Sequence, residues 1–284
     1  MRMKTTSFVL LAAAGVLALS LGAGRANPPA PCNLITGMVR DQYGTPLTAT
    51  NATVLLRTPG GAVVAGQVLP NYAPGLNYLL RVPMDAGSSP GLYMADAQAG
   101  GAQFQLWVVV NGATNLPIEM TGSYDSLGKP GAQARINLTL GVDSNGDGIP
   151  DAWETAFLQS LGLNLPLSAL NANSVLGATG LTLRQEYLFG AYPYNPALPC
   201  SITFSGFHAG SPDLTFPTVN GRTYTVLVSS DTRNWTTAGF RLATDDSASP
   251  ARSSYYSGSA GTVEVYVTPP AAAPAASFYR VLVQ

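Results

Sequence analysis

The sequence predicts a mainly β protein in which two antiparallel β-sandwich-like domains are joined by a short helical segment. Short runs of β-forming residues separated by turns fill the chain on both sides of its middle. Only the middle stretch changes to a helical period. Charged residues make up 10% of the chain, which also has 30 glycines and 22 prolines, and this composition suits short strands joined by tight turns.

Residues 1–26 predict a secretory signal peptide. Arg2 and Lys4 precede an apolar run from Phe8 to Gly22, and small residues follow around Ala26. The run is shorter than the roughly 20 residues that span a bilayer. We therefore expect cleavage after Ala26, no membrane span in the mature chain, and a location outside the cell, at its surface or in the periplasm.

The charge balance of the mature chain disfavours nucleic acid and anionic lipid as partners. Without Arg2, Lys4 and Arg25, 11 of the 14 basic residues remain against 15 acidic residues, a net charge near −4. The two cysteines, Cys32 and Cys200, suit a disulfide in an oxidising compartment, and two buried thiols are the alternative.

Residues 32–141 predict the first β-sandwich. An Asp41-Gln42-Tyr43-Gly44 sequence has the residue preferences of a type I turn. About seven short strands in one domain indicate a sandwich. The expected strands are Leu34–Arg40, Ala52–Arg57, Val63–Leu69, Tyr78–Val82, Phe104–Val110, Pro117–Thr121 and Ala134–Leu140.

The segment ITGMVRDQYGTPLTATNATVLLRT resembles the transthyretin-like or carboxypeptidase-regulatory-like modules of secreted proteins. In those modules a strand ends in a Gly-containing turn, and a Pro-Leu pair leads into the next strand. The resemblance implies a β-sandwich that acts as a stalk or binding platform, and implies no chemistry.

Residues 142–196 predict a pair of short helices. Trp153, Phe157 and Leu161 are spaced four apart, on one face of a helix. Thr182 and Gln185 form a capping-box pattern that opens a second helix. The helical pair would then connect the two β domains.

Residues 200–284 predict the second antiparallel β domain. Asn220-Gly221 predicts a hairpin between a strand near Phe216 and an alternating strand near Val226. Val263, Val265 and Val267 predict another strand, and Ser277–Val283 a last one.

The segment VDSNGDGIPDAWE predicts a calcium site. Calcium takes six to eight oxygen ligands, and a 12-residue loop supplies them from positions 1, 3, 5, 7, 9 and 12, with Gly at position 6. Every position fits when the count starts at Asp143. The predicted ligands are the side chains of Asp143, Asn145 and Asp147, the Ile149 carbonyl, Asp151 directly or through water, and bidentate Glu154. Gly148 takes position 6.

The alternative is a solvated loop that merely caps the helix, since Asp151 and Glu154 also suit a helix start. Capping does not explain Asp143, Asn145 and Asp147 at alternate positions. No basic residue lies between Arg135 and Arg184, so the loop's four carboxylates have no counter-charge nearby in the sequence. A dication is the natural compensation.

A strand is expected before this loop where an EF-hand has a helix, so the loop resembles those of dockerins and thrombospondin type 3 repeats. GLTLRQEY resembles the end of a second such loop, with Glu186 at position 12, but Val175, Gly177 and Thr179 stand where acids belong. DSNGDGIPDAWE, then GLTLRQEYLFGAYPYNP, then a β domain ending in SFYRVLV resembles a type of exported bacterial multi-module protein. The resemblance implies a calcium loop and helix pair before a C-terminal β domain.

No enzymatic motif is present, and we expect a non-enzyme. The one histidine, His208, is expected in a surface turn. The function predicted is a secreted structural or adhesion-type protein, with calcium rigidifying the junction between its β domains and an extracellular glycan or protein as a further partner. The alternative is a carbohydrate-binding accessory protein of a polysaccharide-degrading system, with Trp235 as a platform. Core packing is the simpler expectation for Trp107, Trp153 and Trp235.

Overall fold

The structure is a computed structural model that describes residues 30–49, 51–70, 72–87, 94, 96–189, 201–269 and 277–284. Over these residues the fold is mainly β, with two α-helices and several antiparallel sheets, so the predicted mainly β class is confirmed. The expected signal peptide at residues 1–26 lies outside the described residues. None of the described helices has the length and apolar character that crossing a membrane requires.

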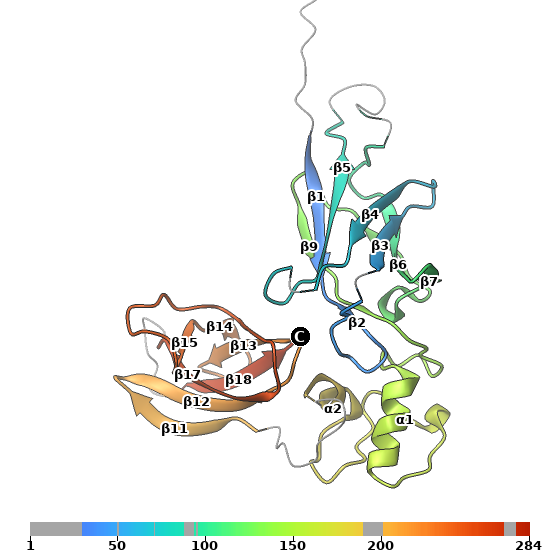
Figure 1. Ribbon diagram of the computed structural model, residues 1–284. Coiled ribbons are helices and arrows are strands. Elements are labelled where there is room, and N and C mark those ends of the chain that lie inside the picture. The colour runs from blue at the N-terminus through green and yellow to red at the C-terminus, as the bar shows by residue number, and fades with distance from the viewer. Residues whose placement is uncertain are drawn as a thin grey trace, which may run out of the picture.

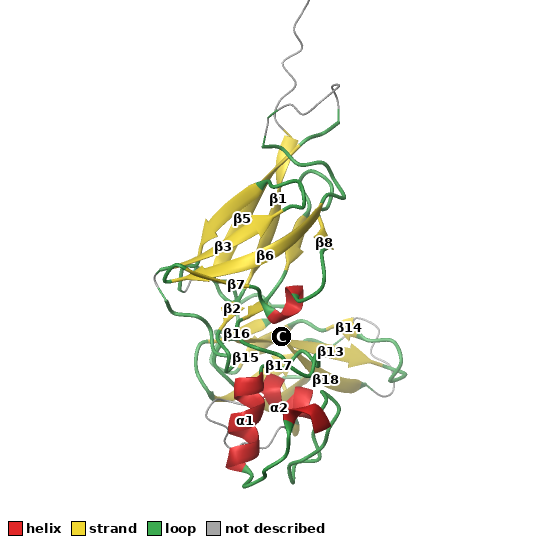
Figure 2. Cartoon of the chain, turned by 90° about the vertical axis from the view of Figure 1, so that its right-hand side faces the viewer, coloured by secondary structure: helices red, strands yellow, loops and turns green. Residues whose placement is uncertain are grey.

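Three separate hydrophobic cores define three modules. The N-terminal module has a core that runs from Ile35 to Leu138. The helical module has a core from Ile149 to Tyr187, and the C-terminal module one from Leu214 to Val283. Figure 1 shows the N-terminal module above the two helices and the C-terminal module beside them. Figure 2 shows the same arrangement from the side, with the helices below the first set of strands.

The N-terminal module forms when alternating side chains of short strands turn inward. Leu80 and Leu106 are fully buried at such inward positions. Its sheets have the strand orders β5-β1-β9, β10-β2 and β4-β3-β6-β7, with β8 pairing β6. The elements are β1 (Ala30–Gly37), β2 (Val39–Arg40), β3 (Ala52–Arg57), β4 (Val63–Gln67), β5 (Tyr78–Met84), β6 (Gln103–Val110), β7 (Ala113–Asn115), η1 (Ile118–Met120), β8 (Asp125–Ser126), β9 (Gln133–Arg135) and β10 (Leu138–Thr139).

Several details of this module differ from the sequence prediction. The strand expected at Pro117–Thr121 is wrong, because η1 is a 3-10 helix that follows Pro117 and buries Met120. A five-residue pattern with a proline at its start is too short to separate the two states. The long strands expected at Leu34–Arg40 and Ala134–Leu140 are each divided in two. Their halves pair in parallel, β1 with β9 and β2 with β10, so the module is not wholly antiparallel.

The helical module contains α1 (Asp151–Ser160), η2 (Leu167–Ala169) and α2 (Leu183–Phe189). Trp153 stacks on Phe157 at 5.0 Å and meets Tyr187 edge-on at 5.3 Å, so the predicted apolar face joins the two helices. The capping box is present, because Thr182 N–H donates to Gln185 Oε1 at 2.9 Å and Gln185 N–H to Thr182 Oγ1 at 3.3 Å.

The C-terminal module consists of two sheets, with strand orders β11-β12-β17-β15 and β14-β13-β16, the latter extended by β18 on β13. The predicted Asn220-Gly221 hairpin is wrong, because β12 and β13 lie in different sheets and Gly221 N–H donates to Ser257 O. Asn220 and Gly221 reverse the chain between β12 and β13, but they do not determine which strands β12 and β13 pair with. The strands are β11 (Thr203–His208), β12 (Ser211–Thr218), β13 (Arg222–Ser229), β14 (Thr236–Thr237), β15 (Phe240–Leu242), β16 (Tyr255–Ser257), β17 (Gly261–Val267) and β18 (Phe278–Val283).

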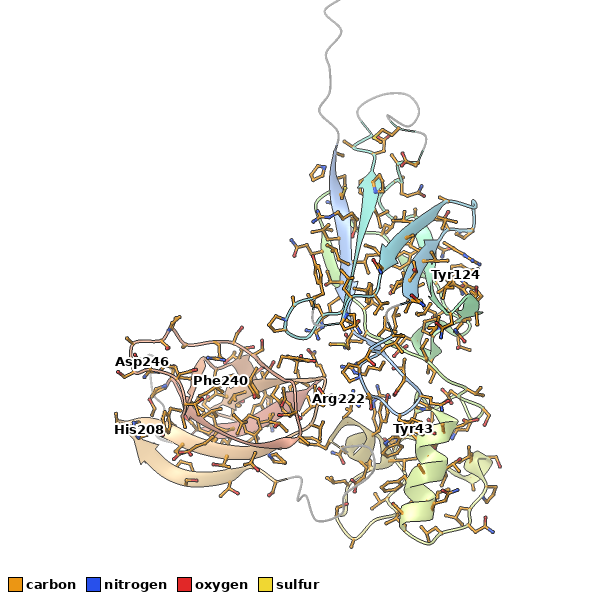
Figure 3. All side chains as sticks on the ribbon, viewed as in Figure 1. Tyr43, Tyr124, His208, Arg222, Phe240 and Asp246 are labelled. Carbon is orange, nitrogen blue, oxygen red and sulfur yellow. The ribbon has the colours of Figure 1, made fainter. Side chains whose placement is uncertain are left out.

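Polar contacts join the modules at one junction. Arg40 Nη2 donates to Gly221 O at 3.1 Å, and Arg222 Nη2 donates to Tyr187 O at 2.9 Å. Figure 3 labels Arg222 on the side of the C-terminal module that faces α2. Gly221 has φ +81° and lies so close to Pro46 that a Cβ atom there would stand 2.2 Å from Pro46 Cγ. The N-terminal module thus contacts the C-terminal module directly, and the latter contacts the helical module.

Candidate metal centre

The acidic loop runs from β10 to the first turn of α1. Its chain reversals need glycine, because Gly146 and Gly148 have φ +72° and +84°. The Ile149 side chain is fully buried in the helical core, which anchors the loop against α1. Gly148 therefore has the backbone conformation expected at position 6, and the peptide of Ile149 at position 7 is held in place by its own side chain.

The Asp143 carboxylate organises the first half of the loop. Its Oδ1 accepts hydrogen bonds from the backbone N–H of Gly146 at 2.8 Å and of Asp147 at 3.2 Å. Its Oδ2 accepts one from Gly148 N–H at 2.9 Å. Asp143 thus holds positions 4 to 6 in a tight turn around one carboxylate.

The Asp147 and Glu154 carboxylates are only partly satisfied. Asp147 Oδ1 accepts from Ile149 N–H at 2.9 Å, but its Oδ2 is buried without a hydrogen-bond partner. Glu154 is fully buried, and its Oε2 has no partner either. Asn145 Nδ2 donates weakly to Glu154 Oε1 at 3.4 Å and to Leu167 O at 3.3 Å. A buried carboxylate oxygen without a protein partner is costly, so a cation or a hydrogen-bond donor at these two atoms would be stabilising.

The Asp151 carboxylate turns back into the loop and does not cap the helix. Its Oδ1 accepts from Ser144 N–H at 2.8 Å, and the first turn of α1 has no side-chain cap. The helix-capping alternative therefore does not describe Asp151 in this structure. Asp151 closes the loop onto its own beginning.

The electrostatics of the loop are unfavourable for its carboxylates. Burial, followed by the charge of Asp147, raises the pKa of Glu154 to about 7. Burial, followed by the neighbouring Asp143, raises the pKa of Asp147, which Arg184 opposes. Sequence reasoning missed Arg184 as a counter-charge, because it reaches the loop from α2 through the fold.

The carboxylates are not drawn together in this structure. Among the described residues, no three His, Cys, Asp or Glu side chains are grouped closely enough to hold a metal ion. Asn145 also turns its amide nitrogen, and not its oxygen, toward Glu154. The donor set nevertheless suits calcium, since the predicted ligands are all oxygens and two of them are buried carboxylate oxygens with no partner. A bound ion would require the Asn145 amide to turn over and the acidic side chains to close in.

The second loop is satisfied by its own side chains. Glu186 is buried and its Oε1 accepts a short hydrogen bond from the Thr179 hydroxyl. Val175 forms a single β-bridge with Thr182 across the loop. The Thr179 hydroxyl at position 5 therefore hydrogen-bonds the Glu186 carboxylate at position 12, which would bind the ion in an acidic loop.

The other candidate residues are the tryptophans, His208 and the cysteines. Trp153 is buried as expected, but Trp107 and Trp235 are only half-buried, so core packing is wrong for those two. Arg280 covers the Trp235 ring at 4.3 Å and the indole N–H donates to Thr232 O. His208 ends β11, where its ring stacks on Tyr266. Cys32 has no disulfide to any described residue, and Cys200 lies outside them.

No family model matches this chain, and no curated protein matches it in sequence. The resemblances noted in the sequence therefore stay predictions.

Proposed function

We propose that this chain is an exported structural or adhesion-type protein that binds one calcium ion in the loop from Asp143 to Glu154. The observation that carries the proposal is the pair of buried carboxylate oxygens, Asp147 Oδ2 and Glu154 Oε2, that have no protein partner. They occupy positions 5 and 12 of a sequence in which every calcium-ligand position is filled by an oxygen donor. A divalent cation would offset both the burial of these carboxylates and their mutual repulsion.

The ion is proposed to stiffen the junction between the β domains. The loop connects the N-terminal module to α1, and α2 contacts the C-terminal module through Arg222. Ordering the loop would therefore fix the orientation of the helices relative to the N-terminal module, and with it the orientation of the C-terminal module that contacts α2. With 1 mM calcium and a dissociation constant of about 0.1 mM, binding would stabilise the folded form by about 1.4 kcal/mol.

Calorimetric titration of the purified protein with calcium tests this proposal. We expect one saturable site with a dissociation constant of about 0.1 to 1 mM, the range of extracellular modules. Asp147→Asn should lose the site. Asp125→Asn removes one carboxylate from the exposed strand β8 and serves as the matched control. The absence of saturable heat, together with equal thermal unfolding with and without calcium, would overturn the proposal.

The stiffening is tested separately by small-angle X-ray scattering. The wild-type protein should show a narrower distribution of interatomic distances in calcium than without it, and Asp147→Asn should show the broad distribution in both. Calcium binding without any change in scattering would leave the ion site in place but refute its role at the junction.

A further inference from the structure

A second polar site lies where the three modules meet. It is a cavity of about 660 Å³, within the size range of small-molecule sites. Arg40 and Arg135 line it from the N-terminal module, Arg184 from α2, and Arg222 from the C-terminal module. Four of the few basic residues of the chain therefore converge from segments far apart in the sequence.

The positive charge of this cavity is not balanced by its acidic residues. Glu119 and Asp143 are the acidic side chains that line it, and the terminal residue Gln284 lines it as well. Glu119 already accepts hydrogen bonds at 2.7 Å from both the N–H and the hydroxyl of Thr139, and burial raises its pKa. Asp143 is occupied by three backbone N–H groups of the acidic loop.

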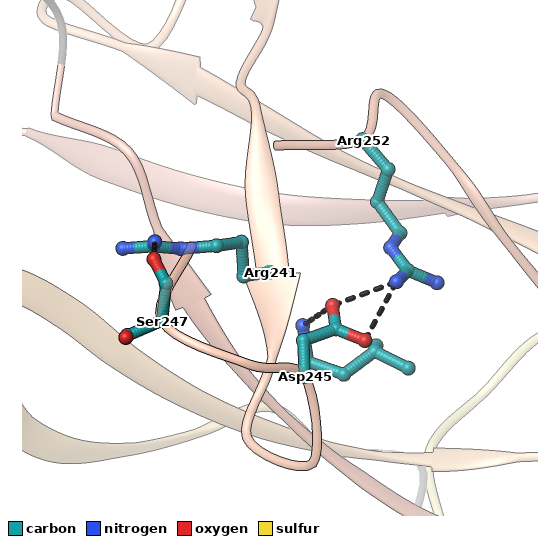
Figure 4. Close-up of polar contacts among 5 residues, drawn as sticks. Arg241, Asp245, Ser247 and Arg252 are labelled. Atoms are coloured by element: carbon teal, nitrogen blue, oxygen red, sulfur yellow. Dashed lines mark hydrogen bonds and ion pairs between the residues drawn. The ribbon is translucent and has the colours of Figure 1, made fainter. Parts of the chain in front are cut away.

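None of the four arginines forms a salt bridge with a described residue. Within the described part of the chain, the salt bridge that the structure contains joins Arg252 and Asp245 at 2.6 Å, and neither residue lines the cavity (Figure 4). The two buried arginines use their donors on backbone carbonyls, Gly221 O for Arg40 and Tyr187 O for Arg222. Neutral acceptors satisfy geometry but leave the charge uncompensated.

Arg40 supplies a separate indication of a missing acceptor. Its side chain is 4% exposed, and its Nε is buried without any hydrogen-bond partner. Burial, and then the charge of Arg222, lower its pKa to about 9. Tyr187, which also lines the cavity, has a buried hydroxyl without a partner. Unpaired buried donors of this kind are uncommon in folded proteins and call for an acceptor.

We propose that this cavity binds a small multivalent oxyanion, a ligand with carboxylate or phosphate groups, through Arg40, Arg135, Arg184 and Arg222. Guanidinium groups match the geometry of both oxyanions and form short, charge-assisted hydrogen bonds with them. Arg184 and Arg135 are exposed and meet the ligand from the solvent side, while Arg40 and Arg222 form the buried wall. The net negative charge of the whole chain does not prevent binding of an anion, because four arginines are concentrated at this cavity.

The site does not depend on the calcium proposal, since the unpaired donors belong to residues outside the acidic loop. The test is therefore made in calcium-free buffer prepared with a chelating resin, because soluble chelators are themselves polycarboxylates. Inorganic phosphate and succinate, titrated calorimetrically at constant ionic strength, distinguish a phosphate site from a dicarboxylate site. Saturable one-to-one binding of either probe supports the proposal, and the tighter one identifies the ligand class.

Arg184 is the residue to change, because its side chain is exposed and its guanidinium donates no hydrogen bond to a described residue, whereas its backbone N–H donates to Ala172 O. Arg184→Gln should weaken binding about tenfold, and Arg184→Lys should weaken it less, because Lys keeps the charge but loses the fork. Arg81→Gln, on the exposed face of β5, is the matched control for loss of one positive charge. Absence of saturable binding of both probes, or an equal loss in Arg81→Gln and Arg184→Gln, would overturn the proposal.

Discussion

Replacing Glu154 by Gln should stabilise the metal-free protein and at the same time abolish its response to calcium. Glu154 is fully buried, and its pKa is about 7 in the folded protein against 4.5 for an ordinary glutamate. Because the folded-state pKa is raised, the wild-type protein loses stability as the pH rises from about 4.5 to 7. At 1.36 kcal/mol per pKa unit, the loss amounts to at most about 3 kcal/mol above pH 7.

The glutamine side chain introduced by Glu154→Gln cannot ionise, so the variant avoids this loss and keeps nearly the same shape. Urea unfolding followed by circular dichroism, in metal-free buffer, should show Glu154→Gln more stable than wild type by up to about 3 kcal/mol at pH 8. At pH 5 the two proteins should differ little. Calcium at 1 mM should raise wild-type stability by about 1.4 kcal/mol and leave the variant unchanged, so the difference between them narrows.

Two results would refute this reasoning. If the variant is less stable than wild type at pH 8 without metal, the Glu154 carboxylate has stabilising partners in the fold. If calcium stabilises both proteins equally, the ion binds without Glu154, and the assignment of position 12 is wrong.

Other predictions concern the junction, the C-terminal module and the coupling of the two sites. Gly221→Ala should destabilise the contact between the β domains, because its Cβ would stand 2.2 Å from Pro46. Gly210 has a similar positive φ but lies in open space, so Gly210→Ala measures the backbone strain alone. Differential scanning calorimetry of the two variants compares their melting temperatures. Asp245→Ala should lower the free energy of unfolding by about 1 to 2 kcal/mol in urea denaturation, because it removes the contacts that the Asp245 carboxylate makes in Figure 4. The adjacent Asp246→Ala should cost less, because the Asp246 carboxylate makes only local hydrogen bonds. Calcium should tighten succinate binding a few-fold in the calorimeter, since it would neutralise a loop carboxylate that borders the anion cavity; unchanged affinity would show that the two sites are independent.

The sequence predicts most of the elements of the fold, because these depend on local patterns. Ala52–Arg57 is predicted to the residue, and the capping box from Thr182 to Gln185 forms as expected. Pairing between strands is not a local property, which is why Asn220-Gly221 turns the chain but does not make a hairpin. The parallel pairing of β1 with β9 likewise depends on residues about 100 positions apart.

The same distinction separates the two sites. The acidic loop is contiguous, so its donors and their spacing are visible in the sequence. The arginine cavity collects Arg40, Arg135, Arg184 and Arg222 from three modules, and no spacing rule connects them. The sequence offered one weak signal for this cavity, which is that the chain has few basic residues. When several of so few arginines turn out to lie together in the fold, a shared ligand is a natural explanation.

Because Ile149 is buried in the helical core, the fluorescence of Trp153 in that core can report on the loop. Ile149 carries a proposed ligand on its backbone and shares the helical core with Trp153, while Trp107 and Trp235 belong to the other two modules. Each module thus contains one indole in a different environment. Ion-dependent changes in emission that disappear with Trp153→Phe, and persist when either of the other two is replaced, would locate the conformational response within the helices.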